Sequence, residues 1–505
     1  MAHRHLARSP WFEARALKKE GALDVVWHKR LGEMPLAISV DIDIADRAEG
    51  MMLGLAIGDS LGNTSESMLP RARRDVLGWI EDSLPNRHAG GNAVGLPTDD
   101  TQMAFWTLEH LLAEGRLEPH YLASAFTRRR IFGIGKSVRE FVANFKSGVE
   151  WTYAGAESAG NGAIMRIAPM LLPYLAKPSD DLWSYSLLAA NLTHRDAMSN
   201  AACVAFVDLL WKLVSKTGTP EGRWWIDTFA ATCADLETER EYVPRGGKPA
   251  GFRGTLSKML HTHVLPALEA NLPVLEACER WHSGAYLLET VPSFLYILAR
   301  HGHDPKAAIL EAVNHTKDND TIAAIVGAAV GALHGRRNLP SSWIDNLLGR
   351  TTAVDDGRVF ELLARAGSAF GYGVSDAVLA RVPPGALARP LLIWSPSDSP
   401  PPVQFPIDKR TCWIKITGML QQNWAVINDL PNTDRVRIWF FDDDADIFDC
   451  MELSNRDTAR VALARNGFSV YTSERFSFIA KPGPIAHWNG EAARPIYSSG
   501  RYWIG

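Results

Sequence analysis

The sequence lacks the cysteine pattern of a protein held together by disulfides or zinc. It has 5 cysteines among 505 residues, an odd number, and they are widely spread with no Cys-x-x-Cys pair. A disulfide framework or a structural zinc site needs paired or closely spaced cysteines. We therefore expect neither, and a few separated thiols fit a reducing cytoplasm.

Long apolar runs and a strong charge imbalance are also missing. No run of about 18 apolar residues indicates a membrane span, and the basic, aromatic start of the chain has no apolar core of signal-peptide type. The formal net charge is −4, which argues against an overall electrostatic grip on nucleic acid. We expect a cytoplasmic protein with neither a membrane nor a nucleic acid as its partner.

The length and composition of the chain are those of a globular protein with more than one domain. Hydrophobic residues make up 46% and charged residues 22%, which is a normal globular balance. A length of 505 residues exceeds one domain of usual size, and a Pro- and Ser-rich stretch at residues 383–402 is typical of a linker. We predict an N-terminal extension (1–44), a core domain (45–382), this linker, and a C-terminal domain (403–505).

The core domain shows the periodicity of helices. Apolar residues recur at the spacing of one helix face, which predicts helices over residues 44–61, 99–114, 122–145, 198–214, 289–298 and 305–314. No strand pattern interrupts them, so we predict an all-α bundle. Residues 67–97, which contain several prolines and glycines, are predicted to form a long loop of the kind that often serves as a lid or a binding edge.

The C-terminal domain has a different pattern. Residues 412–416, 436–441 and 476–479 have the composition of β-strands, and residues 458–466 look helical. We predict a small α/β or α+β domain. Its acidic run at residues 442–446 fits a solvated turn better than a cation site, because such runs seldom carry the full ligand set of a hard cation.

Two acidic clusters stand at the starts of predicted helices. Thr98-Asp99-Asp100-Thr101 opens one, and Asp318-Asn319-Asp320-Thr321 opens another that is rich in Ala and Gly. Each cluster alone could be an ordinary helix cap. Brought together, four carboxylates and the flanking hydroxyls would suit a pair of hard divalent cations, which prefer oxygen ligands and need neither His nor Cys.

A third stretch has the composition of a ligand-binding turn. Ser158-Ala159-Gly160-Asn161-Gly162 predicts a turn of small residues that leads into a helix at Ala163. Glycine permits close approach of a ligand to the backbone, and the exposed amides at a helix start bind phosphate oxygens. The plainer interpretation is an ordinary Asn-Gly turn.

These stretches, together with one nearer the start, resemble the ADP-ribosylglycohydrolase family. Four blocks match in order: residues 54–62 with Glu66 following, residues 98–101, residues 160–166 with 192–194 after them, and residues 318–321 with their helix. The resemblance covers roughly residues 45–370. Many relatives carry Gly-Gly-Asp-Thr-Asp at the fourth block, whereas this chain has Thr-Lys-Asp-Asn-Asp, which keeps the Asp-x-Asp pair and places Lys317 beside it.

The resemblance implies an ADP-ribosylglycohydrolase-like helical bundle that removes ADP-ribose from a modified acceptor. The acceptor would be a protein side chain, above all arginine, or a small molecule, and the glycosidic bond at ribose C1″ would be cleaved. The implied metals are two Mg²⁺ or Mn²⁺ ions held by Thr98, Asp99, Asp100, Asp318, Asp320 and Thr321. The implied catalytic residues are Glu66, Asp100 and Asp320, and the implied contacts to ADP-ribose are Ser158, Gly160, Asn161, Gly162 and His194. Asp59 is expected close to the metals.

Two other functions are compatible with the sequence. The N-terminal extension mixes aromatic and basic residues, so it is either an arm packed on the core or a surface that binds an ADP-ribosyltransferase toxin. The second reading would make the chain an immunity protein. The other candidate is a catalytically silent ADP-ribose sensor with the C-terminal domain as its output, and the intact carboxylate set argues against it.

Overall fold

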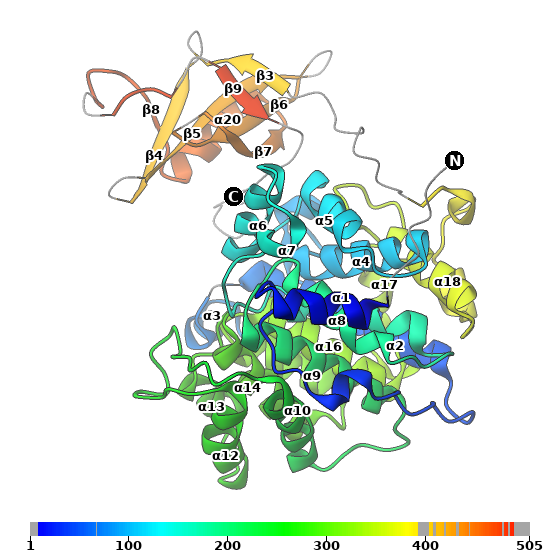
Figure 1. Cartoon of the computed structure of the whole chain (residues 1–505). Coiled ribbons are helices and arrows are strands. Elements are labelled where there is room, and N and C mark those ends of the chain that lie inside the picture. Colours follow the sequence, from blue (N-terminus) through cyan, green and yellow to red (C-terminus); the bar gives the residue numbers. More distant parts are fainter. Residues whose placement is uncertain are drawn as a thin grey trace. The chain divides into compact units, whose positions relative to one another are not determined.

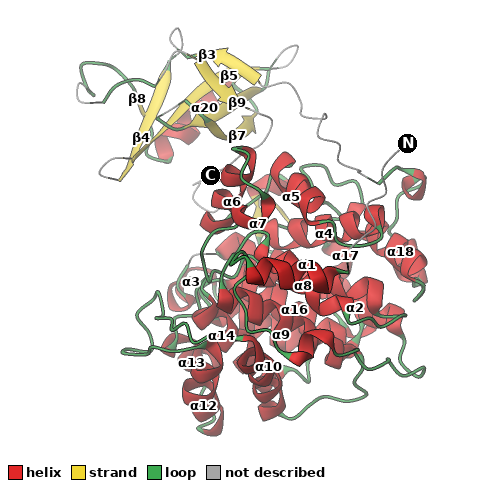
Figure 2. Cartoon of the chain, viewed as in Figure 1, coloured by secondary structure: helices red, strands yellow, loops and turns green. Residues whose placement is uncertain are grey.

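The computed structural model describes residues 9–66, 68–391, 403–407, 411–418, 421–430, 434–443, 445–476, 479–482 and 485–488. The chain divides into two compact units, one from residues 1–84, 93–125 and 135–393 and the other from residues 85–92, 126–134 and 394–505. The larger unit is helical, and the smaller one is dominated by a β-sheet (Figures 1 and 2).

The described helices that precede the linker are short to medium in length. They are α1 (Pro10–Lys19), α2 (Ile44–Gly62), α3 (Pro70–Leu77), α4 (Asp99–Glu114), α5 (Pro119–Arg128), α6 (Lys136–Lys146), α7 (Trp151–Ala154), α8 (Asp181–Asn191), α9 (Ala197–Val214), α10 (Gly222–Leu236), α11 (Leu256–Met259), α12 (Leu265–Glu269), α13 (Val274–Arg280), α14 (Leu287–His301), α15 (Pro305–His315), α16 (Asn319–His334), α17 (Ser341–Asn346), α18 (Arg358–Phe370) and α19 (Asp376–Leu379). Short 3₁₀ turns join several of them, among them η1 (Lys29–Gly32), η4 (Ile164–Arg166) and η5 (Ala168–Tyr174).

The predicted all-α core is confirmed. Helices α2, α4, α9 and α15 begin and end within a residue or so of their predicted bounds. In residues 9–391 as described, strands are limited to the two-residue pair β1 (Pro85–Asn86) and β2 (Asn92–Ala93).

Two local predictions in the core were wrong. Residues 122–145 are not one helix, because the chain leaves α5 and passes through Gly133 with a φ of 80° before α6 begins. The segment predicted as a loop at residues 67–97 contains helix α3. That helix starts at Pro70, whose fixed φ suits the first helical position, and stops at Gly78 with a φ of 72°.

Helices α2 and α16 pack against each other backbone to backbone. Gly50, Gly54, Gly58 and Gly62 recur at every fourth residue of α2 and so lie on one helix face. A Cβ atom added to Gly54 would overlap the carbonyl oxygen of Gly327 on α16, and a Cβ on Gly327 would overlap the carbonyl oxygen of Gly54. The two helices therefore approach more closely than side chains normally allow.

The α2–α16 pair lies inside the larger unit, as Figure 1 shows for α16. Every residue of α16 from Asn319 to Leu333 is buried. Helix α9, which is long and apolar enough to cross a membrane by length and composition, is 94% buried in the same unit. Such burial is typical of the core helix of a globular domain.

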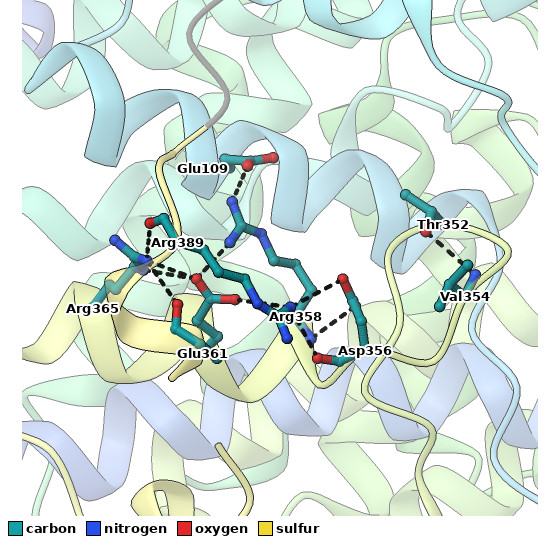
Figure 3. A network of polar contacts seen from close by, with 9 residues as sticks. Glu109, Thr352, Val354, Asp356, Arg358, Glu361, Arg365 and Arg389 are labelled. Carbon is teal, nitrogen blue, oxygen red and sulfur yellow. Dashed lines mark hydrogen bonds and ion pairs between the residues drawn. The ribbon is translucent and has the colours of Figure 1, made fainter. Parts of the chain in front are cut away.

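A network of buried ion pairs joins α4 to α18 (Figure 3). The Arg358 guanidinium bonds Glu109 on α4 and, at 2.5 Å, Glu361 Oε1 on its own helix. Glu361 is fully buried and also accepts a hydrogen bond from Arg365 Nε at 2.9 Å. Because the carboxylates are paired with guanidinium groups, their burial is compensated, and α4 is held in place behind its acidic first turn.

The described part of the N-terminal extension packs on the helical unit. The Trp183 indole donates to the carbonyl of Glu33 at 2.7 Å, and the Trp211 indole donates to the carbonyl of Leu36 at 3.0 Å. Arg30 forms an ion pair with Asp235 at 2.8 Å. Binding of a toxin by this extension stays a prediction.

The C-terminal unit is an antiparallel sheet with a helix, which confirms the predicted α+β character. Its described strands are β3 (Val403–Pro406), β4 (Cys412–Gly418), β5 (Gln421–Asp429), β6 (Val436–Phe441), β7 (Ile447–Leu453), β8 (Ser469–Val470) and β9 (Ile485–Trp488), and its helix is α20 (Arg456–Arg465). Five strands pair in the order β7-β6-β5-β4-β8, and β3 pairs with β9. Both faces of the five-stranded sheet carry apolar clusters, and Ala459 and Leu463 of α20 belong to one of them.

The strand predictions in this unit were partly right. Strands β4 and β6 match the predicted segments, whereas β5 and β7 were missed. In the predicted strand at 476–479, Phe476 lies in a turn and Ile479 in a bend, and residues 477 and 478 lie outside the described residues. In the acidic run, the amide of Asp442 donates to the carbonyl of Asp446 at 3.1 Å, as expected of a turn; residue 444 lies outside the described residues.

The close contact of α2 with α16 can be tested by adding one methyl group. We expect Gly54→Ala to lower the free energy of unfolding by about 3 kcal/mol or more, since overpacking forces backbone atoms apart. The matched control is Gly218→Ala, because Gly218 is exposed and an added Cβ there meets nothing within 4 Å. Chemical denaturation measures both variants, and equal stabilities would contradict the close packing.

Candidate active site

Asp59 connects the end of α2 to the start of α4. Its carboxylate accepts hydrogen bonds from the hydroxyls of Thr98 and Thr101, both at 2.5 Å, and from their amides at 2.8 and 3.2 Å. Burial raises the pKa of Asp59, and these four donors lower it. Because the Thr98 hydroxyl donates its proton to Asp59, the lone pairs of its oxygen stay available for another ligand.

The two predicted acidic clusters lie next to each other. Asp99 and Asp100 occupy the first turn of α4, and Thr321 on α16 donates to Asp100 Oδ2 at 3.4 Å. Asp100 is 1% exposed, and its Oδ1 atom has no hydrogen-bond partner in the described part of the chain. A buried carboxylate oxygen without a donor is costly, so this atom faces a place where a cation or a donor would be favourable.

Glu66 joins the cluster from the segment after α2. One carboxylate oxygen each from Glu66, Asp318 and Asp320 lie within 4.8 Å of one another. Asp318 and Asp320 are buried, and Glu66 is partly exposed. The structure therefore brings Glu66 to the Asp-x-Asp pair, although about 250 residues separate them in the sequence.

The electrostatics of the cluster fit a divalent cation. Burial, followed by the neighbouring carboxylates, raises the pKa of Asp99, Asp100 and Asp320 well above the ordinary value. Burial also raises the pKa of Asp318 to about 6, although Asn161 and Lys317 oppose the shift. An oxygen-only donor set of this kind suits Mg²⁺ or Mn²⁺, whose charge would offset the repulsion. The residues present fit such an ion.

The small-residue turn at residues 158–162 is tied to the acidic cluster through Asn161. Its Nδ2 atom donates to Asp318 Oδ2 at 2.6 Å and to Thr290 Oγ1 at 3.0 Å. The turn also exchanges backbone bonds with residues 285–287, where Ala159 accepts from Leu287 at 2.9 Å. The turn and the carboxylates thus form one continuous polar surface.

His194 lies behind this turn. Its side chain is 1% exposed, and its ring approaches so closely that a Cβ on Gly162 would stand 2.9 Å from Cε1. Thr193 accepts from Arg166 at 2.7 Å and bonds His194 Nδ1 at 3.0 Å. Burial lowers the pKa of His194 to about 3. A neutral ring packed under the turn supports its shape, and the role of His194 as a contact to ADP-ribose stays a prediction.

The helix predicted to start at Ala163 is absent as such. The chain forms the three-residue 3₁₀ turn η4 and then η5 instead. Pro169 and Pro173 in this segment cannot donate the backbone hydrogen bonds of an α-helix. The argument for phosphate binding at a helix N-terminus therefore does not apply here. A ligand could instead contact the backbone of Gly160 and Gly162.

The side chain of Arg73 joins the segment around Glu66 to the segment before Asp318, a role that the sequence analysis did not predict. This arginine is 1% exposed and lies on α3. It donates to carbonyl oxygens in two segments. One flanks Glu66, and the other precedes Asp318. The acceptors are Ser65, Met68, Val313, Thr316 and Lys317. Burial lowers its pKa to about 10. Because Arg71 and Arg74 stand beside it in the sequence, nothing in the spacing distinguishes the buried arginine.

A strained segment supports the Asp-x-Asp pair from the other side. His282 and Ser283 both have positive φ, 73° and 45°, which is uncommon for residues other than glycine. Ser283 accepts from the amide of Asp318 with its carbonyl at 3.0 Å and from the amide of Lys317 with its hydroxyl at 3.1 Å. The Lys317 ammonium in turn donates to His282 Nε2 at 2.9 Å. The residue that departs from the family pattern is therefore held at the edge of the site.

Comparisons with known proteins show which proteins the chain resembles. The sequence profile of ADP-ribosylglycohydrolase matches residues 41–370. The chain is 27% identical over 333 residues to the ADP-ribosyl-[dinitrogen reductase] glycohydrolase of Rhodospirillum rubrum, covering 64% of this chain and 98% of that protein. It is 27% identical over 314 residues to the ADP-ribosylarginine hydrolase Tri1 of Pseudomonas putida, covering 60% and 74%. A solved structure described as an ADP-ribosylglycohydrolase-related protein complex is 25% identical with a TM-score of 0.47, covering 66% of this chain and 99% of that one.

The connecting role of Arg73 can be tested by hydrogen exchange. We expect Arg73→Met to speed amide exchange in residues 63–69 and 313–321 together and to lower the free energy of unfolding by about 3 kcal/mol, because several buried carbonyls lose their donor. The control is Arg71→Met on the same helix, whose exposed side chain pairs with Glu279 at 2.6 Å. Exchange that rises in one segment alone would contradict the connection.

Proposed function

The chain belongs to the ADP-ribosylglycohydrolase family, and from that membership we propose that it is a metal-dependent hydrolase that removes ADP-ribose from arginine side chains. The general activity, removal of ADP-ribose from a modified acceptor, is that of its relatives. The observation that carries the proposal is the cluster of Glu66, Asp318 and Asp320 oxygens within 4.8 Å of one another, tied by Asn161 to a turn of small residues.

Six residues would hold two Mg²⁺ or Mn²⁺ ions. They are Thr98, Asp99, Asp100, Asp318, Asp320 and Thr321, which offer only oxygen atoms. Two observations support this assignment: Asp100 Oδ1 has no hydrogen-bond partner among the described residues, and the lone pairs of the Thr98 hydroxyl remain available. When bound, such cations lower the pKa of a water molecule towards neutrality and orient hydroxyl groups.

Glu66 is the residue we propose for proton transfer. It is the partly exposed member of the carboxylate cluster, so it can reach both a water molecule and the substrate. Cleavage at a glycosidic carbon develops positive charge on the ribose. A carboxylate at this place can take a proton from the attacking water and stabilise that charge. Asp100 and Asp320, held more deeply, would keep the reacting groups in position.

The turn at residues 158–162 would bind the ADP-ribosyl group. Its glycines let a ligand approach the backbone, and Asn161 fixes Asp318 beside it through the 2.6 Å hydrogen bond. A ribose placed between turn and carboxylates would have its C1″ atom near Glu66. Arginine as the acceptor is supported by a relative named as an ADP-ribosylarginine hydrolase.

The first prediction from this proposal concerns release of ADP-ribose from ADP-ribosylarginine protein. We expect release with Mg²⁺ or Mn²⁺, none with a chelator, and a loss of at least about 100-fold in the double variant Asp318→Ala/Asp320→Ala, since both would be metal ligands. The control is Asp345→Asn, an exposed aspartate on α17 that lies 3.9 Å from Arg381. Release from serine-linked substrate alone would replace arginine as the acceptor, and release that survives the chelator would end the metal proposal.

The role of Glu66 gives a second prediction. Glu66→Gln keeps the size of the side chain but cannot take a proton, so turnover should fall by about 100-fold or more while the affinity for ADP-ribose stays close to that of the unmodified protein. Calorimetric titration with ADP-ribose measures the affinity, and Glu81→Gln, at an exposed position, is the control. A loss of affinity for ADP-ribose as large as the loss of turnover would show that Glu66 binds the substrate and does not transfer a proton.

A further inference from the structure

A second loop reaches the small-residue turn from outside the four family-like blocks. The loop is closed at its base, where Tyr242 and Gly254 exchange backbone hydrogen bonds at 2.9 and 3.1 Å. At its tip, the amide of Gly247 donates to the carbonyl of Pro244 at 3.2 Å, and Gly247 has a φ of 67°. Arg245 therefore occupies the second position of a tight turn.

This tip is held firmly against the helical unit. The amide of Gly246 donates to Glu289 Oε1 at 2.6 Å, and Glu289 is 2% exposed on α14. A Cβ added to Gly246 would overlap the ring of His282. The backbone at Gly246 is thus fixed, and Arg245 beside it is exposed to solvent.

The Arg245 side chain contacts the small-residue turn, and its charge opposes the rise that burial causes in the pKa of Glu289. Its guanidinium donates to Ser158 Oγ at 3.3 Å and lies 4.5 Å from the centre of the Tyr286 ring. Among the residues that the structure describes, no Asp or Glu forms an ion pair with it. Arg240 and Arg253 of the same region do have such partners, Asp196 at 3.2 Å and Glu241 at 4.0 Å.

Ser158 is arranged to meet an acceptor. Its oxygen receives hydrogen bonds from Ser137 Oγ at 2.9 Å, from the Gly160 amide at 3.2 Å and from Arg245. These three donors already outnumber the two lone pairs of a hydroxyl oxygen, so the O–H group of Ser158 is left to donate to another group. An unpaired guanidinium and a free hydroxyl proton at one place favour an anionic ligand.

We propose that Arg245 binds the diphosphate of the ADP-ribosyl group against the turn at residues 158–162. The inference rests on the proposed function, since it takes ADP-ribose to be the ligand. A guanidinium presents a planar pair of donors that matches two phosphate oxygens. Asn161 of the same turn donates to Asp318 Oδ2 at 2.6 Å, so the turn adjoins the carboxylate cluster. In ADP-ribose the diphosphate is likewise joined directly to the ribose that carries C1″.

The test is the affinity for ADP-ribose and its dependence on salt, measured by calorimetric titration. Arg245→Gln should weaken binding by about tenfold or more, the usual worth of a hydrogen bond to a charged group. The affinity of the variant should also depend less on ionic strength, since one cation–anion contact is gone. Arg245→Lys should recover part of the loss because it keeps the charge but not the paired donors.

The matched control is Arg253→Gln, an exposed arginine of the same loop, which should leave both quantities unchanged. Melting temperatures show that each variant is folded. If the unmodified chain binds ADP-ribose and Arg245→Gln binds it equally well with the same salt dependence, the role of Arg245 is wrong and the proposed function stands. If the unmodified chain binds no ADP-ribose, both are overturned.

Discussion

The contact between α2 and α16 is the constraint on which the rest of the structure depends. It is made by backbone atoms, because glycines on both helices remove the side chains that would separate them. The contact continues to the site itself, where a Cβ on Gly62 would overlap the backbone of Asp320. Asp59 lies near the end of α2 and Glu66 shortly after it, whereas the Asp-x-Asp pair lies at the start of α16. Changes of side-chain rotamer cannot relax a contact between backbones, so the spacing of the two helices, and with it the backbone positions of Asp59 and Asp320, is fixed.

The helical unit treats buried carboxylates in two different ways. Glu109 and Glu361 are matched by Arg358 and Arg365, so their charges are compensated within the protein. At the start of α4 the arrangement differs: Asp59 accepts hydrogen bonds from the hydroxyls and amides of Thr98 and Thr101, Asp100 accepts one from the Thr321 hydroxyl, and no arginine of the described residues forms an ion pair with Asp59, Asp99 or Asp100. The first arrangement stabilises the position of α4, and the second leaves negative charge for something else to balance. Both kinds of carboxylate occur on α4: Asp99 and Asp100 lie in its first turn, at the site, and Glu109, which is paired with Arg358, lies about two turns later.

Many of the helices and the acidic clusters could be predicted from the sequence, because they depend on local residue patterns. The acidic clusters, the helix starts they occupy and the apolar faces behind them are all visible within a few residues. The contacts of Arg73 could not be predicted, since it joins carbonyls on both sides of the site that lie about 240 residues apart. The positive φ angles of His282 and Ser283 could not be predicted either, because they depend on the hydrogen bonds of this segment to Lys317 and Asp318 and not on residue type. The same holds for α3, whose place depends on the burial of one arginine.

The way Arg73 holds the segment before Asp318 bears on how the site can change over evolution. It recognises Val313, Thr316 and Lys317 only through their carbonyl oxygens, and every residue type carries that group. The loop can therefore keep its path while its side chains mutate. Lys317 illustrates this: its carbonyl accepts from Arg73, while its ammonium donates to His282 Nε2 at 2.9 Å beside the Asp-x-Asp pair. A different side chain at this position would change the charge next to Asp318 and leave the backbone hydrogen bonds to Arg73 in place.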